Sequence, residues 1–170
     1  MLIAMAGLPG AGKSSVAEAL GRRLTAPVVS VDPIEAAMWR AGVARDQPTG
    51  LAAYVVAEAV ADGVLGMGQT VIVDAVNAVE AARGQWRSLA DRHGVLVVFI
   101  EVVCSDPVVH RRRLENRSRA IEGFAEPEWE VVEGLREEFA SWADHRLVLD
   151  AMTDLSSNVV TALDFLSATE

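Results

Sequence analysis

The chain has 170 residues, the length of one ordinary domain, and its hydrophobic fraction of 51% and charged fraction of 23% are typical of globular proteins. The net charge of −9 argues against a large nucleic-acid-binding face, because a phosphate backbone needs a basic surface. Cys104 is the only cysteine, no uninterrupted apolar run reaches the roughly 18 residues that cross a bilayer, and no secretory leader precedes the first apolar segment, so we expect a cytoplasmic protein without a membrane partner.

Five short apolar segments predict β-strands. They are mostly continuous rather than alternating and rich in Val, Ile and Leu, which is typical of a parallel sheet covered on both faces. Helical patterns lie between them, beginning with the stripe Val16, Leu20 and Leu24. This alternation predicts one α/β domain over residues 1–170, a three-layer doubly wound parallel five-stranded sheet. The predicted strands are 2–6, 27–31, 70–73, 95–103 and 146–149.

Two connections are longer than a minimal crossover requires. The first, residues 33–69, predicts two helices separated by the turn-rich stretch 46–50, and we expect it to bind an acceptor. The second contains an arginine-rich run, a loop and a helix over about 128–140. We expect a lid insertion there, over about 106–127.

The segment GLPGAGKS, residues 7–14, matches the G-x-x-x-x-G-K-[ST] phosphate-binding motif between a predicted strand and a predicted helix. Glycines let successive backbone N–H groups turn toward one anion, and a helix that starts at Lys13 directs its positive dipole end at the same charge. Lys13, the only lysine, can bridge the β- and γ-phosphates, and the Ser14 hydroxyl can bind Mg²⁺. We therefore predict that ATP and Mg²⁺ bind here, on Gly10, Ala11, Gly12, Lys13, Ser14 and Ser15.

Several kinds of P-loop protein do not fit this chain. A GTPase carries an N-K-x-D segment that reads guanine, and here no lysine follows Lys13. Transporter and motor ATPases need additional helical domains or a second signature loop, for which 170 residues leave no space. The small kinase format remains, with a core sheet, an acceptor-binding insertion after the second strand and an arginine-bearing lid.

The runs GLPGAGKSS, VVSVDP, VIVDAVN and RLENR resemble the small P-loop kinases of the polynucleotide-kinase, adenylylsulfate-kinase and chloramphenicol-phosphotransferase type. The resemblance extends over most of the chain in the order of its elements. It implies an enzyme that transfers the γ-phosphoryl group of ATP to a hydroxyl of a small molecule, such as an antibiotic, a nucleoside or another metabolite. The motifs specify nucleotide phosphoryl transfer but only weakly specify the acceptor.

Two aspartates follow predicted strands that open on the crevice of the phosphate-binding loop. Asp32, at the end of the second strand, can orient an acceptor hydroxyl for attack, and the resemblance implies that it is the catalytic base. A helix cap is the alternative role for Asp32, and Glu35 is a weaker candidate for the base. Asp74 resembles a Walker B acid that binds Mg²⁺ together with Ser14, although the two aspartates could exchange roles. Ala75 stands where many ATPases have a glutamate that activates water, which favours transfer over hydrolysis.

Five of the fourteen arginines lie between residues 111 and 119. Arg113 and Arg117 are spaced to share one helix face, and they resemble the lid arginines of nucleotide-monophosphate-type kinases. The resemblance implies that one stacks on adenine while the other neutralises the transferring phosphoryl group. Arg112 or Arg119 could take either role.

The remaining notable side chains are three histidines and three residues of the first insertion. The histidines, His93, His110 and His145, lack metal-ligand spacing, and we expect capping or surface roles for them. Met38, Trp39 and Tyr54 either line an acceptor pocket or belong to the core.

The alternative functions are a 5′-hydroxyl polynucleotide or RNA kinase, an ATP-switched binding module without kinase activity, and a toxin that phosphorylates cell-wall precursors. The oligomeric state stays open.

Overall fold

The computed structural model describes residues 1–117, 126–140 and 142–169. Its core is a five-stranded sheet in the order β2-β3-β1-β4-β5, in which every neighbouring pair is parallel. This confirms the predicted α/β fold class. The ends of each predicted strand lie within two residues of the ends of an observed strand. The strands are β1 (Leu2–Ala6), β2 (Val28–Ser30), β3 (Val71–Asp74), β4 (Val97–Val103) and β5 (Arg146–Asp150).

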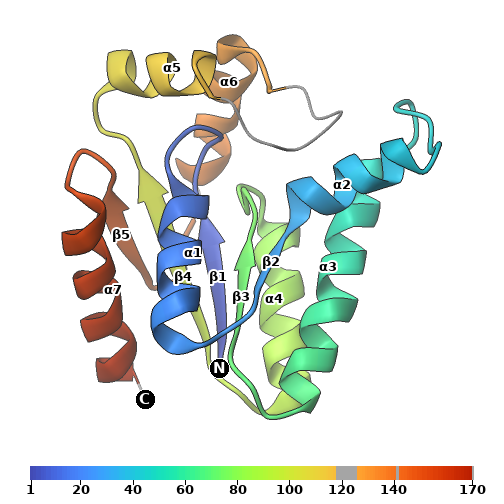
Figure 1. Ribbon diagram of the computed structural model, residues 1–170, viewed down its shortest axis with the longest axis vertical. Helices are drawn as coiled ribbons and strands as arrows, with labels where there is room; N and C mark the ends of the chain where they lie inside the picture. The colour runs from blue at the N-terminus through green and yellow to red at the C-terminus, as the bar shows by residue number, and fades with distance from the viewer. Residues whose placement is uncertain (118–125, 141, 170) are drawn as a thin grey trace.

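Helices cover both faces of the sheet, and α5 and α6 lie across the end toward which the strand arrows point (Figure 1). The residues of α1 and α7 pack in one hydrophobic cluster with Ile3, Met5 and Ile100. Those of α3, α4 and α6 pack in the other, with Leu2 and Ala4. The helices are α1 (Lys13–Leu24), α2 (Val31–Arg40), α3 (Thr49–Gly66), α4 (Glu80–His93), α5 (Pro107–Glu115), α6 (Trp129–Ala140) and α7 (Leu155–Thr169).

Helix α3 is held to the domain by alanines. Ala53, Ala57 and Ala61 repeat every four residues, so they form one face of the helix, and all three are fully buried. Their small side chains allow the helix backbone to approach the core closely. The acidic side chains of α3 pair with α4: Glu58 lies 2.7 Å from Arg92, and Asp62 lies 2.9 Å from His93.

One expectation about α3 needs correction. Among the described residues, α3 is long and apolar enough, by length and composition, to cross a membrane, with a mean hydropathy of 1.3 over 18 residues. We expected no apolar run of that length, and α3 meets the criterion although it contains Glu58 and Asp62. The alanine face and the ion pairs to α4 are the contacts of a helix packed in a folded domain.

A second correction concerns Asp32. Strand β2 ends at Ser30, so Asp32 lies in the first turn of α2 and does not end the strand. Pro33 follows within the same turn, where its missing N–H costs no helical hydrogen bond. The Asp32 carboxylate therefore lies at the N-terminal end of α2, where the helix dipole favours a negative charge.

Candidate functional site

The phosphate-binding loop has the backbone that its glycines permit. Gly7, Gly10 and Gly12 have φ angles of 133°, 82° and 106°, in the region that residues with a side chain rarely adopt. A Cβ atom on Gly7 would overlap the carbonyl oxygen of Val102, so space also demands glycine there. The Gly7 N–H donates to Val76 O at 3.1 Å, which joins the start of the loop to the residues after β3.

Lys13 begins α1 and is buried, with 7% of its surface exposed. Its ammonium group donates a hydrogen bond of 3.1 Å to the carbonyl oxygen of Leu8, inside the loop itself. A buried cation beside a glycine-rich loop at a helix N-terminus favours a bound anion. The predicted role of Lys13 on phosphate is compatible with this position.

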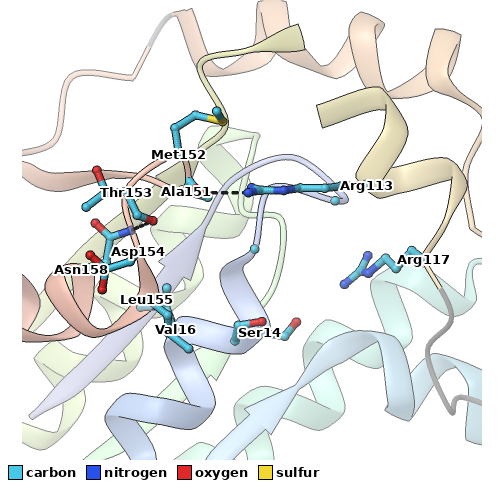
Figure 2. Close-up of a pocket in the computed structure, with 13 residues that line it drawn as sticks. Ser14, Val16, Arg113, Arg117, Ala151, Met152, Thr153, Asp154, Leu155 and Asn158 are labelled. Atoms are coloured by element: carbon cyan, nitrogen blue, oxygen red, sulfur yellow. Dashed lines mark hydrogen bonds between the residues drawn. The ribbon is translucent and has the colours of Figure 1, made fainter. Parts of the chain in front are cut away.

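A pocket of about 570 Å³ opens beside the loop. Figure 2 shows Ser14 and Val16 of α1 on one side of it and the start of α7 on another, with Arg113 and Arg117 reaching in from α5 and the residue stretch after it. It collects four of the predicted cofactor-binding residues and both predicted lid arginines. The lining residues are Gly10, Gly12, Ser14, Ser15, Val16, Arg113, Arg117, Ala151, Met152, Thr153, Asp154, Leu155 and Asn158.

The wall formed by residues 151–158 was missed in the sequence. It follows β5, and the rule that ligands bind at the carboxyl ends of parallel strands could have indicated it. Asn158 fixes this turn by donating to Asp150 O at 2.9 Å, and Asp154 accepts from the Ser157 N–H at 3.0 Å. The turn is therefore a stable surface against which a flat ligand can pack.

The two predicted lid arginines lie at the same pocket but are held differently. Arg113 donates to Ala151 O at 3.0 Å, which connects α5 to the turn after β5 (Figure 2). Arg117 lies beyond the last residue of α5, so the two do not share one helix face as the spacing indicated, and it pairs with Glu126 at 3.3 Å. Arg119 and most of the predicted lid loop, residues 118–125, lie outside the described residues.

Asp74 lies at the end of β3, on the side of β1 toward β2. It is 8% exposed and accepts a 3.3 Å hydrogen bond from Ser30 at the end of β2. Burial raises the pKa of Tyr54 to about 12; the hydrogen bond from the Asn77 N–H opposes this shift, and the negative charges of Asp32 and Asp74 add to it. The Tyr54 hydroxyl accepts from the Asn77 N–H at 3.2 Å, and Asp32 follows Ser30, the hydrogen-bond partner of Asp74, by two residues.

Asn77 supports this edge and was not identified as important in the sequence. It is fully buried with a φ of 52°, and its side-chain amide donates to Met5 O at 2.6 Å, two residues before the phosphate-binding loop. Its side-chain oxygen accepts from Trp86 at 2.8 Å, and its backbone N–H donates to Tyr54 at 3.2 Å. One residue thus connects β1, α3 and α4.

Glu35, the weaker candidate for the base, has a structural contact. Its carboxylate accepts a 2.7 Å hydrogen bond from the Thr49 hydroxyl, and that hydroxyl accepts from Trp39 Nε1 at 3.0 Å. These bonds join α2 to the first residue of α3. The Glu35 carboxylate thus serves the contact between these two helices.

The expectation for His110 is wrong. It lies inside α5 rather than at a helix end, is 1% exposed, and its Nε2 lies 2.8 Å from Pro9 O in the phosphate-binding loop. The pattern of the sequence gave no sign of this contact, which joins residues 101 positions apart.

The metal prediction was compared with the available oxygens. Among the described residues, no group of three or more His, Cys, Asp or Glu side chains forms a metal site. Magnesium bound with a nucleotide needs only one or two protein oxygens, because phosphates and water supply the others. The Ser14 hydroxyl, which lines the pocket, and the buried Asp74 carboxylate fit that requirement.

Comparisons with known proteins concern the family and the fold of the chain. A family model described as an AAA domain matches residues 2–141. A search among proteins of curated function gives no match.

Similar folds occur among solved structures. A candidate kinase of Chloroflexus aurantiacus has a TM-score of 0.76 at 20% identity, with 96% of each chain covered. Kti12 of Chaetomium thermophilum, solved with ADP-AlF3, has a TM-score of 0.74 at 21% identity, over 99% of this chain and 98% of that one. The APS kinase of Mycobacterium tuberculosis, solved with AMPPNP and APS, has a TM-score of 0.68 at 19% identity, over 98% and 96%. At these identities the likeness concerns the fold.

Proposed function

The chain belongs to the family described as an AAA domain, its fold is that of the small P-loop kinases, and we propose that it is an ATP-dependent phosphotransferase whose acceptor is a hydroxyl group of a small molecule. The observation that carries the proposal is the placement of the phosphate-binding loop between two functional regions. On one side lies the pocket with Arg113 and Arg117. On the other, Asp74 ends β3 and accepts a hydrogen bond from Ser30, which Asp32 follows by two residues in the first turn of α2. The phosphate donor and the acceptor would meet at the loop. We also propose that the protein is a single domain located in the cytoplasm.

In this proposal the nucleotide occupies the pocket of about 570 Å³. The phosphates lie on the loop from Gly10 to Ser14, where backbone N–H groups, the α1 dipole and Lys13 oppose their charge. The adenine ring of the nucleotide extends toward the turn after β5, beside Arg113. Ser14 and Asp74 would hold Mg²⁺, which would neutralise charge on the phosphate oxygens.

The acceptor would bind on the side of α2 and α3. Its hydroxyl oxygen attacks the γ-phosphorus while the bond from that phosphorus to the β,γ-bridging oxygen breaks, so that ADP leaves. The hydroxyl proton passes to the Asp32 carboxylate and then to solvent. Catalysis is then mostly positioning and charge stabilisation, with Lys13 and Arg117 on the transferring group.

A second function is favoured by one comparison. Kti12, solved with ADP-AlF3, is nearly as similar in fold as the candidate kinase, so a module that binds and hydrolyses ATP to control a partner protein is the second candidate. Ala75, at the position after Asp74, counts against it, because many ATPases carry a glutamate there. A polynucleotide kinase is the less favoured acceptor class, given the net charge of −9.

The test is ATP consumption by the purified protein with Mg²⁺, against pooled nucleosides, sugars and hydroxylated antibiotics, with products identified by mass. Asp32→Asn is compared in parallel, because it keeps the shape of the side chain and removes the base. A product heavier by one phosphate, formed by the wild type and reduced in the variant, supports the kinase. Equal slow ATP loss in both proteins, with no phosphorylated product, would favour the binding module.

A further inference from the structure

His110 lies at the interface between the lid elements and the phosphate-binding loop. It is in α5, its Nε2 lies 2.8 Å from Pro9 O, and its ring meets that of Trp129 of α6 edge to face, with 5.1 Å between the ring centres. Leu114, one turn further along α5, is buried and lies close to Gly10. The face of α5 that carries both side chains thus rests directly on the loop.

The hydrogen bond fixes the chemical form of His110. Pro9 O is a carbonyl and can only accept, so Nε2 carries the proton. Nδ1 is buried and, within the part of the chain that the structure describes, has no hydrogen-bond partner. A second proton on Nδ1 would therefore be buried without an acceptor.

The charged groups around the ring act in the same direction. Burial lowers the pKa of His110, the hydrogen bond to Pro9 opposes this, and three cations from three elements lower it further: Arg136 of α6, Lys13 of α1 and Arg113 of α5. His110 is therefore a neutral imidazole with one directed N–H, and that N–H has one partner, the loop.

Arg113 follows His110 by three residues in the same helix, so the two side chains are neighbours on its surface. Arg113 reaches from that position to Ala151 O at the far wall of the pocket. The contact at Pro9 thereby sets where α5 lies above the loop, and with it how far Arg113 extends across the nucleotide pocket.

We propose that His110 is a positioning residue, whose Nε2–H holds the phosphate-binding loop and the α5–α6 elements in the arrangement that receives the nucleotide. The role rests on the proposed nucleotide-binding function and adds a residue to it that touches no substrate. Without the bond, the loop and α5 would sample other positions, and the nucleotide would have to order them as it binds. The affinity for ADP should fall while the ligand contacts themselves are unchanged.

The experiment uses two variants that differ in the position of one amide. His110→Gln can place its side-chain N–H near the position of Nε2, whereas the shorter His110→Asn cannot reach Pro9. His145→Asn serves as the control, because His145 is exposed and lies just before β5, away from the loop. Two quantities are measured in all proteins: hydrogen exchange of the amides of residues 7–15 without ligand, and the ADP·Mg²⁺ dissociation constant by calorimetry.

We expect His110→Asn to exchange the loop amides about tenfold faster and to bind ADP about tenfold more weakly, the effect of one lost hydrogen bond, and His110→Gln to stay within about threefold of the wild type. Equal behaviour of the two variants in both measurements would overturn the proposal. If the wild type binds no nucleotide, the proposed function fails, and the exchange rates alone still decide whether His110 holds the loop.

Discussion

Ser30 and Asp74 lie in register at the carboxyl ends of β2 and β3, and the Ser30 hydroxyl donates to Asp74 Oδ2 at 3.3 Å. On its other side Asp74 is in register with Met5 of β1, two residues before the phosphate-binding loop. A carboxylate flanked in this way is oriented by its neighbours, and Ser30 is the neighbour whose side chain binds it. Ser30 therefore supports the aspartate predicted to bind magnesium, a role that the sequence analysis did not assign to it.

This arrangement predicts unequal effects of two substitutions. Asp74→Asn removes the metal-binding charge and should lower the rate at saturating ATP by about 100-fold or more. Ser30→Ala removes only the orienting hydrogen bond and should raise the Mg²⁺ concentration for half-maximal activity by about tenfold. Rates measured across a magnesium titration test both. Unchanged magnesium dependence in Asp74→Asn would remove Asp74 from the metal site.

Lys13→Ala should weaken the binding of ATP·Mg²⁺ by about 100-fold, because the loop loses its one buried cation. Isothermal titration calorimetry measures the dissociation constant directly. Arg22→Ala is the matched control: it removes a cation from the same helix, at an exposed position paired with Glu18, and should leave the affinity unchanged. ATP affinity retained in Lys13→Ala would contradict the proposed site.

The two pocket arginines should separate in a kinetic experiment. Arg113 lies against the turn after β5, so Arg113→Ala should mainly weaken nucleotide binding. We place Arg117 on the transferring phosphoryl group, so Arg117→Ala should mainly lower kcat, by about 100-fold, at nearly constant KM for ATP. The opposite division between kcat and KM would exchange their assignments.

Two glycines should respond oppositely to the same methyl group. Gly7→Ala introduces a Cβ that overlaps Val102 O at a φ of 133°, and we expect a loss of about 3 kcal/mol or more in the free energy of unfolding. Gly63 lies in α3 with open space around it, so Gly63→Ala should stabilise the protein by about 0.5–1 kcal/mol. Urea denaturation of both variants measures the difference. A destabilised Gly63→Ala would contradict the open space around this position.

Stability should depend on pH through His110. Its pKa in the folded protein is lowered from the ordinary value of 6.5, so the unfolded chain binds the proton more readily. The stabilising contribution is therefore complete above pH 6.5 and is lost as the pH falls toward the folded pKa. The free energy of unfolding of the wild type should fall over this interval relative to His110→Gln, which does not titrate. Parallel profiles would show that His110 titrates alike in both states.

The sequence predicted what depends on neighbouring residues. Continuous apolar runs are sufficient to predict buried parallel strands. The run GLPGAGKS is sufficient to predict the loop, because its glycines adopt the positive φ angles that the loop requires. Features that depend on packing were missed or misplaced. Asp32 lies in α2, which begins at Val31, two residues before the expected start of the first insertion. The contact between His110 and Pro9 exists only once α5 packs on the loop. The turn at residues 151–158 carries no motif at all.

The place of β1 at the centre of the sheet has a consequence for divergence. Strands β3 and β2 lie on one side of β1, and β4 and β5 lie on the other. The segment 31–66 connects β2 to β3, whereas the pocket is lined by residues that follow β1, β4 and β5. The contacts of this segment with the rest include a row of buried alanines, the ion pair of Glu58 with Arg92 and the hydrogen bond between Asn77 and Tyr54. We therefore expect substitutions in this proposed acceptor segment to change the choice of acceptor while the loop proposed to bind the phosphate donor keeps its structure.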